Sequence, residues 1–199
     1  AGLSFVNAII LFSATIYIQI LLQKVIGIDL EAAGLTICAM VLPMLTSSIL
    51  SSRYVGRTKH YRGVVVYGSL VLLLALMNFS FLLYTASHSY LYIVLSLIPI
   101  GLGMGTMMSV FNIIIQTVYG RERLGEVTGA MQLVRGLGGV IGTSILGFIY
   151  NYAMESHVLG NSLVTINHAI YMVFAFVTML ALAGYIIALQ IREERLVNG

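Results

Sequence analysis

The sequence has few charged residues. Lys, Arg, Asp and Glu make up 9% of its 199 residues, whereas about 25% of a typical soluble domain is charged. The mean hydropathy is +1.00, because apolar stretches fill almost the whole chain and only short polar breaks separate them. A water-soluble protein cannot bury this much hydrocarbon. The composition therefore excludes a soluble domain and predicts a protein that crosses a bilayer several times.

The sequence also lacks the motifs of common enzymes and metal sites. It has no HExxH, no GxSxG and no His, Cys, Asp or Glu cluster at metal-ligand spacing, so we expect no enzyme activity, metal or cofactor. The run Gly101-x-Gly103-x-Gly105 lies inside an apolar stretch, without the strand that a dinucleotide site needs. The single cysteine, Cys38, excludes an internal disulfide and is expected to be a packing residue. The net charge of +3 is too small to suggest nucleic acid as a partner.

The apolar stretches have the length of membrane-spanning helices. A helix needs about 20 residues to cross a hydrocarbon core ~30 Å thick, and helices satisfy their own backbone groups in lipid. We predict an all-α membrane protein in which residues 1–199 form one bundle. Its spans are expected at residues 3–22, 32–51, 64–84, 91–118, 127–150 and 166–191. Because a span begins almost at Ala1, which is not a methionine, we expect a piece of a longer protein.

The basic residues are distributed unevenly between the loops. Only Lys24 lies in the odd-numbered loops. The second loop, the fourth loop and the C-terminal tail contain eight: Arg53, Arg57, Lys59, Arg62, Arg121, Arg123, Arg192 and Arg195. Lys and Arg in short loops favour the cytoplasmic side. The pattern predicts that both ends of the chain are cytoplasmic.

Glycine content differs between the spans. The third and sixth each contain one glycine, Gly68 and Gly184, which suits helices that face lipid. The fourth and fifth are glycine-rich, and small residues four apart let helices approach closely in lipid. We therefore expect both to lie in a tightly packed interior, with contacts at Gly101, Gly105, Gly138, Gly139 and Gly142.

Arg135 is the one charged side chain well inside a span. A central arginine costs ~2.5 kcal/mol or more and usually faces a cavity or a partner, although its long side chain can also reach back to the headgroups. Gln132 lies three residues before it, and Asn112 and Gln116 are four apart on the fourth span. We expect a shared polar cavity, with substrate or inter-bundle contacts at Asn7, Gln19, Met104, Met107, Phe111, Asn112, Gln116, Gln132 and Arg135. For each amide and methionine, simple helix packing is the alternative.

Several short segments follow one another in a recognisable order: Ile20–Gly27 followed by Ala33-Gly34-Leu35 and Pro43, then Ile100–Gly105, and Gly125–Gly129 leading to Arg135–Gly142. Together they resemble the major facilitator superfamily of transporters, and its fourteen-helix drug:proton antiporter branch in particular. The loop Ser48–Arg62 is similar to the family's cytoplasmic signature G-x-x-x-D-R-x-G-R. Arg53, Gly56 and Arg57 fit it, whereas Ser48 and Ser52 stand in place of the glycine and the acid.

The resemblance implies the C-terminal six-helix half of a secondary transporter in the cell membrane, driven by protons and exporting amphipathic or cationic compounds. The first, second, fourth and fifth spans would line its cavity, and an N-terminal bundle would supply the carboxylates that couple protons, since the predicted spans contain none. Two alternatives remain open. One is a transporter of a natural metabolite or lipid precursor, and the other is a six-span protein without a transport role.

The predicted orientation is tested by labelling. In a full-length protein whose Cys38 is replaced by serine, a cysteine at Thr58 is expected to react with an impermeant thiol reagent only from the cytoplasm. A cysteine at Ser156 should react only from outside. The reverse sidedness contradicts the orientation that we infer from the loop charges.

Overall fold

The computed structural model describes residues 2–58, 61–85, 90–118, 124–156 and 162–190. These residues form six long helices that are apolar enough to cross a membrane. The helices are α1 (Gly2–Ile20), α2 (Leu30–Thr58), α3 (Arg62–Tyr84), α4 (Tyr90–Val118), α5 (Leu124–Ser156) and α6 (Ser162–Gln190), with a short π-helix, η1 (Leu21–Val25), after α1. The prediction of an all-α six-helix bundle is confirmed.

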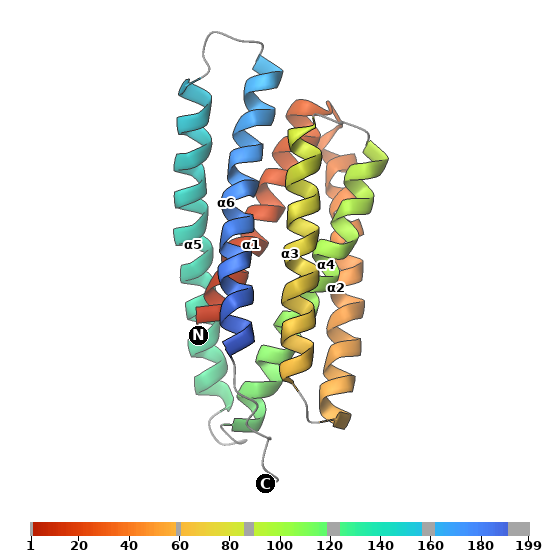
Figure 1. Ribbon diagram of the computed structural model, residues 1–199, viewed down its shortest axis with the longest axis vertical. Coiled ribbons are helices and arrows are strands. Elements are labelled where there is room, and N and C mark those ends of the chain that lie inside the picture. The colour runs from red at the N-terminus through yellow and green to blue at the C-terminus, as the bar shows by residue number, and fades with distance from the viewer. Residues whose placement is uncertain (1, 59–60, 86–89, 119–123, 157–161, 191–199) are drawn as a thin grey trace.

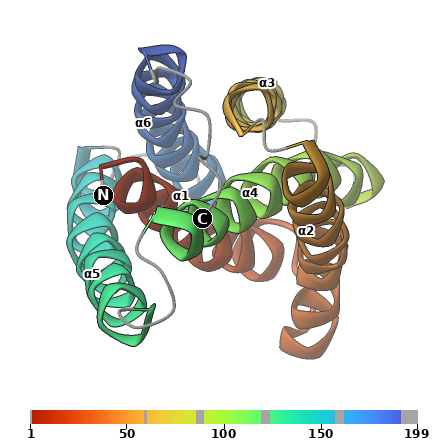
Figure 2. The same cartoon turned by 90° about the horizontal axis from the view of Figure 1, so that it is seen from below.

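The helices run up and down the long axis of the molecule (Figure 1). Seen along that axis, α1 and α4 occupy the middle, α5 and α2 lie on opposite flanks, and α3 and α6 lie side by side along one edge (Figure 2). The most extensive contacts join α2 to α4, α3 to α4, α3 to α6 and α1 to α5. As a result, α4 is the most buried helix, with 61% of its most apolar part covered.

Glycines hold α4 against two neighbours. An ideal Cβ on Gly101 would overlap the carbonyl oxygen of Met40 in α2, and one on Gly105 would overlap the carbonyl oxygen of Met44. On another side of α4, a Cβ on Gly103 would lie 2.8 Å from the Cα of Leu72 in α3. Backbone carbonyls that lie this close to glycine can accept weak Cα–H hydrogen bonds. The spacing of these glycines therefore determines where α2 and α3 cross α4.

Antiparallel contacts between α3 and α6 close the far edge of the bundle. Arg62 at the start of α3 donates from its guanidinium to the carbonyl of Leu189, 3.4 Å away near the end of α6. At the opposite end, the amide of Asn167 donates to the carbonyl of Leu83, 3.1 Å away. Both bonds use side chains near helix ends, so they fix the register of the pair without placing a charge at mid-span.

The junction between α1 and α2 depends on Gly27. Its φ of +76° lies in the left-handed region, which residues that carry a side chain rarely adopt. This conformation lets the N–H of Ile28 reach the carbonyl of Leu22 at 3.0 Å, a helix-ending bond that satisfies a terminal carbonyl. The chain then reverses within a few residues, and α2 begins at Leu30.

The helices are longer than the sequence predicts. The segment Ser48–Arg62 was expected to be a loop, but α2 continues to Thr58, so Arg53, Gly56 and Arg57 lie on its last two turns. Arginine is a good helix former, and its long side chain reaches water from a helix end, so charge alone does not end a helix. The basic residues of the predicted fourth loop and C-terminal tail, together with Lys59, lie outside the described residues.

Two packing expectations were wrong. Gly68 does not lie on an open lipid-facing surface, because it is buried and its ideal Cβ would lie 2.7 Å from Cγ2 of Thr106. Nor is α5 an interior helix of this chain, since only 22% of its most apolar part is buried. Gly138, Gly139 and Gly142 lie on the side that meets α1, and the opposite side exposes large residues such as Leu133 and Phe148.

The glycine contacts can be tested with two alanine substitutions that should change the stability of the protein in different ways. We expect Gly101→Ala to destabilise the full-length protein by ~1–3 kcal/mol, because α2 and α4 must move apart. The matched control Gly34→Ala lies on α2, where a Cβ meets nothing within 4 Å, and should be neutral or stabilising by up to ~1 kcal/mol because alanine favours helix. Thermal unfolding in detergent measures both. Equal effects would contradict the close approach at Gly101.

Candidate functional site

Arg135 lies in the N-terminal half of α5 and is half-buried. Its Nη1 donates to Oε1 of Gln132, 3.3 Å away and one turn earlier on the same helix. A hydrogen bond within one helix satisfies one of the five N–H donors of the guanidinium. The remaining donors are therefore available to groups from other helices or from outside this bundle.

Four helices meet beside the Arg135 side chain. A void of about 10 Å³, close to the least volume that holds one water molecule, separates them. It is lined by Asn7, Ala8 and Leu11 of α1, Met44 of α2, Met104 and Met108 of α4, and Arg135 of α5. None of these lining residues is acidic. The charge of Arg135 thus lies against one neutral amide and an otherwise apolar wall.

The contact between α1 and α5 explains why Arg135 and Asn7 line the same void. The two helices run parallel, and a Cβ on Gly138 would lie 2.9 Å from the carbonyl oxygen of Phe5. One turn further, a Cβ on Gly142 would lie 2.7 Å from Ile9. Gly139 meets the ring of Phe12 in the same way. Because the backbones are this close, a long side chain one turn before Gly138 extends across α1 toward α4.

Some predicted site residues lie together and others do not. Asn7, Met104 and Arg135 line one void, and Gln132 is bonded to Arg135. Asn112 is exposed on α4 and Gln19 is half-buried near the end of α1, both away from that void, while the side chain of Gln116 lies outside the described residues. Met107 and Phe111 are buried in the helix core.

Met104 and Met107 face different neighbours although they are three residues apart. Met107 borders a second void of about 10 Å³ with Val6, Asn7, Ile10, Ser69, Leu72, Ala181 and Gly184. That void lies between α1, α3 and α6. Met107 therefore packs toward the edge formed by α3 and α6, while Met104 faces Arg135.

Met44 is a lining residue that sequence reasoning did not identify. It lies one residue after Pro43 in α2, and its backbone carbonyl packs on Gly105. A search for polar stripes cannot find an apolar lining residue. The available signal is the position of Met44 four residues after Met40, which repeats the four-residue spacing of Gly101 and Gly105 on the facing helix.

The signature residues Arg53, Gly56 and Arg57 lie together at the end of α2, and all are exposed. Ser52 stands where the family pattern has an acid, and its hydroxyl donates to the carbonyl of Ile49 at 3.0 Å. A serine bonded to its own helix cannot replace a carboxylate as an ion-pair partner. Among the residues that the structure describes, no group of three His, Cys, Asp or Glu side chains could hold a metal ion.

Comparison with known proteins agrees with this architecture. Residues 1–143 match the sequence profile of the Major Facilitator Superfamily. The chain belongs to this superfamily. It is 28% identical over 165 residues to the multidrug transporter protein MdtP of Bacillus subtilis. It is also 32% identical over 151 residues to Rv1877, an uncharacterized MFS-type transporter of Mycobacterium tuberculosis.

The alignments cover most of this chain but a small part of each relative. With MdtP, the match covers 81% of this chain and 29% of MdtP. With Rv1877, it covers 74% of this chain and 21% of that protein. The chain thus spans less than a third of the length of these relatives. It is a multi-pass membrane protein of the superfamily and corresponds to a part of proteins of that size.

The two methionines give a matched accessibility test. In a full-length protein without Cys38, Met104→Cys should react with a small methanethiosulfonate reagent at least about tenfold faster than Met107→Cys, because of the two only Met104 lines the void beside the charged Arg135. Both side chains are almost fully buried in the structure, so solvent exposure alone predicts no difference between the two reaction rates. Equal rates would mean that water does not enter from the Arg135 side.

Proposed function

We propose that this chain is the C-terminal six-helix half of a secondary transporter that exports amphipathic or cationic compounds in exchange for protons. Membership in the superfamily and similarity to a multidrug transporter support the export of such compounds. In transporters built from two such halves, the substrate site lies near the midplane between them. The void beside Arg135 is the observation that carries the proposal, since α1, α2, α4 and α5 all contribute to it.

The uncovered surfaces of α2 and α5 support a second bundle as the partner. Only 22% of the most apolar part of each helix is buried, although their mean composition is that of membrane spans. Large residues such as Leu42, Leu45, Leu137 and Val140 are exposed there. An N-terminal bundle that packs on α2 and α5 would enclose Arg135, and the lipid bilayer would cover the remaining outer surface.

The charge of Arg135 indicates what the partner bundle supplies. An arginine at this depth is stabilised when it pairs with another group, and no lining residue of the void is acidic. The described acidic residues of the helices, Glu31, Glu126 and Glu155, lie in their end turns. We therefore assign the proton-coupling carboxylate to the N-terminal bundle, where it faces Arg135 or the substrate. Asn7, Gln132 and Met104 then contact the substrate or that bundle.

The proposed location is the cell membrane, with both ends of the chain in the cytoplasm. This orientation places the arginines at the end of α2 and at the start of α3 on the cytoplasmic side. It also places η1, with Lys24, on the outer side.

Arg135 variants test the proposed role. Efflux of a fluorescent cation, driven by an imposed pH gradient in vesicles that contain the full-length protein, is the measurement. A paired arginine needs its planar fork as well as its charge. Hydrogen bonds to charged groups contribute ~1.5–3 kcal/mol, so Arg135→Lys should lower the rate at least about tenfold, and Arg135→Ala should nearly abolish it.

Two controls make this result specific. Arg53→Lys retains an exposed charge at the end of α2 and should export at the normal rate. The same vesicles without a pH gradient should export little. Near-normal efflux by Arg135→Lys would reduce Arg135 to an anchor at the membrane interface, and efflux that ignores the gradient would contradict proton coupling.

A further inference from the structure

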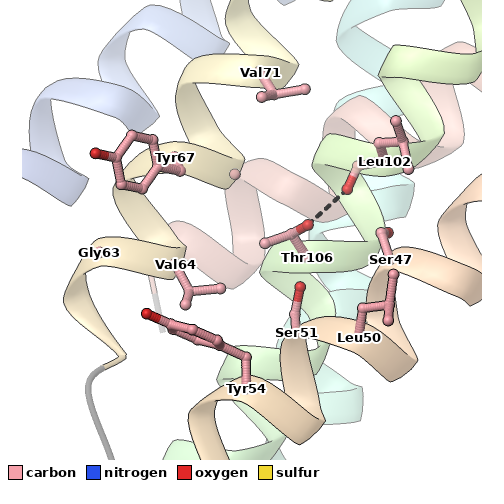
Figure 3. Close-up of a pocket in the computed structure, with 11 residues that line it drawn as sticks. Ser47, Leu50, Ser51, Tyr54, Gly63, Val64, Tyr67, Val71, Leu102 and Thr106 are labelled. Carbon is pink, nitrogen blue, oxygen red and sulfur yellow. Dashed lines mark hydrogen bonds between the residues drawn. The ribbon is translucent and has the colours of Figure 1, made fainter. Parts of the chain in front are cut away.

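A groove of about 590 Å³ lies between α2, α3 and α4, away from Arg135. Figure 3 shows side chains from all three helices around it. They are Ser47, Leu50, Ser51 and Tyr54 of α2, Gly63, Val64, Tyr67, Gly68 and Val71 of α3, and Leu102 and Thr106 of α4. Its volume lies within the ~300–1,000 Å³ range of small-molecule sites. The groove is therefore large enough for a ligand.

The groove follows from the glycines of α4. Gly101 and Gly105 hold α2 on one side of α4, and Gly103 holds α3 on another. With α4 between them, α2 and α3 diverge (Figure 2), and Leu102 and Thr106 form the floor of the space between them. This space is on the outer side of the bundle, beside the peripheral helix α3. In a protein of this superfamily, the bilayer surrounds that side.

The inner part of the groove is apolar toward a ligand. Thr106 donates its hydroxyl to the carbonyl of Leu102 at 2.8 Å, and Ser47 donates to the carbonyl of Met44 at 3.1 Å. Both hydroxyls are thus bonded within their own helices. Leu102 and Val71 complete the wall. This part of the groove suits hydrocarbon.

The end of the groove at the termini of α2 and α3 is polar and basic. Tyr54 lines this end and is exposed by 57%, whereas Tyr67 lines the groove further along α3 (Figure 3). Arg57, also exposed, is not itself a lining residue. It follows Tyr54 by three residues, about 60° around the helix at 3.6 residues per turn, and its long side chain extends from the helix end beside the groove. Arg53 lies about 100° around the helix from Tyr54, at 3.6 residues per turn. A guanidinium and a phenol group at one end of an apolar groove match a phosphate joined to an acyl chain.

We infer that this groove binds an anionic phospholipid of the cytoplasmic leaflet, with an acyl chain between α2 and α3 and its phosphate at Arg57 and Tyr54. The leaflet follows from the orientation proposed above, because these helix ends then lie at the cytoplasmic surface, where anionic lipids attract basic residues. The binding itself requires no transport activity. It therefore stands or falls separately from the exporter function.

Photolabelling of the full-length protein tests the inference. Vesicles of phosphatidylcholine with a minor share of phosphatidylglycerol contain one diazirine-bearing lipid at a time, either phosphatidylglycerol or phosphatidylcholine, and labelled residues are mapped by mass spectrometry. We expect phosphatidylglycerol to label Val71, Tyr67 and Leu102 several-fold more than Met179, a reference on α6 that is as exposed as Tyr67 and more exposed than the other two. Equal labelling by the two lipids in the groove would overturn headgroup recognition and with it the proposal.

Two pairs of variants separate the headgroup from the chain. Arg57→Gln should lower phosphatidylglycerol labelling of the groove about fivefold, the ratio that corresponds to ~1 kcal/mol per basic residue at an anionic surface. Arg53→Gln, with the same loss of charge but one turn further from the helix end, should lower it less. Ser51→Phe fills the groove and should remove labelling of Val71, whereas Cys38→Phe on the same helix should not. Equal loss of labelling in both members of either pair would contradict the assignment.

Discussion

Backbone contact between α4 and its neighbours is the constraint on which the bundle depends. Lipid gives apolar helices no hydrophobic reason to associate, so packing must come from close approach. Gly101 and Gly105 let carbonyls of α2 lie directly on α4, while Gly103 admits the backbone of α3 from another direction. One helix thus fixes two partners at once. The positions of α2 and α3, and the space that remains between them, follow from three residues without side chains.

Glycines also bring α5 into close backbone contact with its neighbour α1. Gly138 and Gly142 bring its backbone onto α1 near Phe5 and Ile9, and this proximity carries Arg135 to the point where α1, α2, α4 and α5 meet. Charge placement and packing are therefore linked, because Arg135 and Asn7 line one void where α5 lies this close to α1. The bulky face of α5 is left outside, so the helix joins the bundle by a narrow strip of small residues.

Much of the fold could be predicted from the sequence, because hydropathy and helix length depend on local composition. The six spans and the positions of Arg135 and the clustered glycines were predictable in this way, whereas the superfamily came from the resemblance of short segments to a known family. The end of α2 was not predictable, since arginine at a helix end resembles a loop by charge alone. The neighbours that Met107 faces and the burial of Gly68 could not be predicted either, because they depend on which helix lies opposite. Three residues of spacing separate Met104 from Met107, and only the arrangement of α1, α3 and α5 shows that they point to different neighbours.

Pro43 marks a point at which α2 can bend. A proline inside a helix removes one backbone hydrogen bond. Pro43 lies between Met40 and Met44, the two residues whose backbone carbonyls pack against α4. From Met44 to Thr58, α2 extends ~22 Å at 1.5 Å per residue, and Ser47 and Val55 are buried along this stretch. A tilt of about 10° at Pro43 would move the far end by ~4 Å, a displacement that follows from the same helical rise. A tilt of this size would change the distance between Arg57 and the start of α3, and so would link the contacts of Met40 and Met44 with α4 to the outer surface of the bundle.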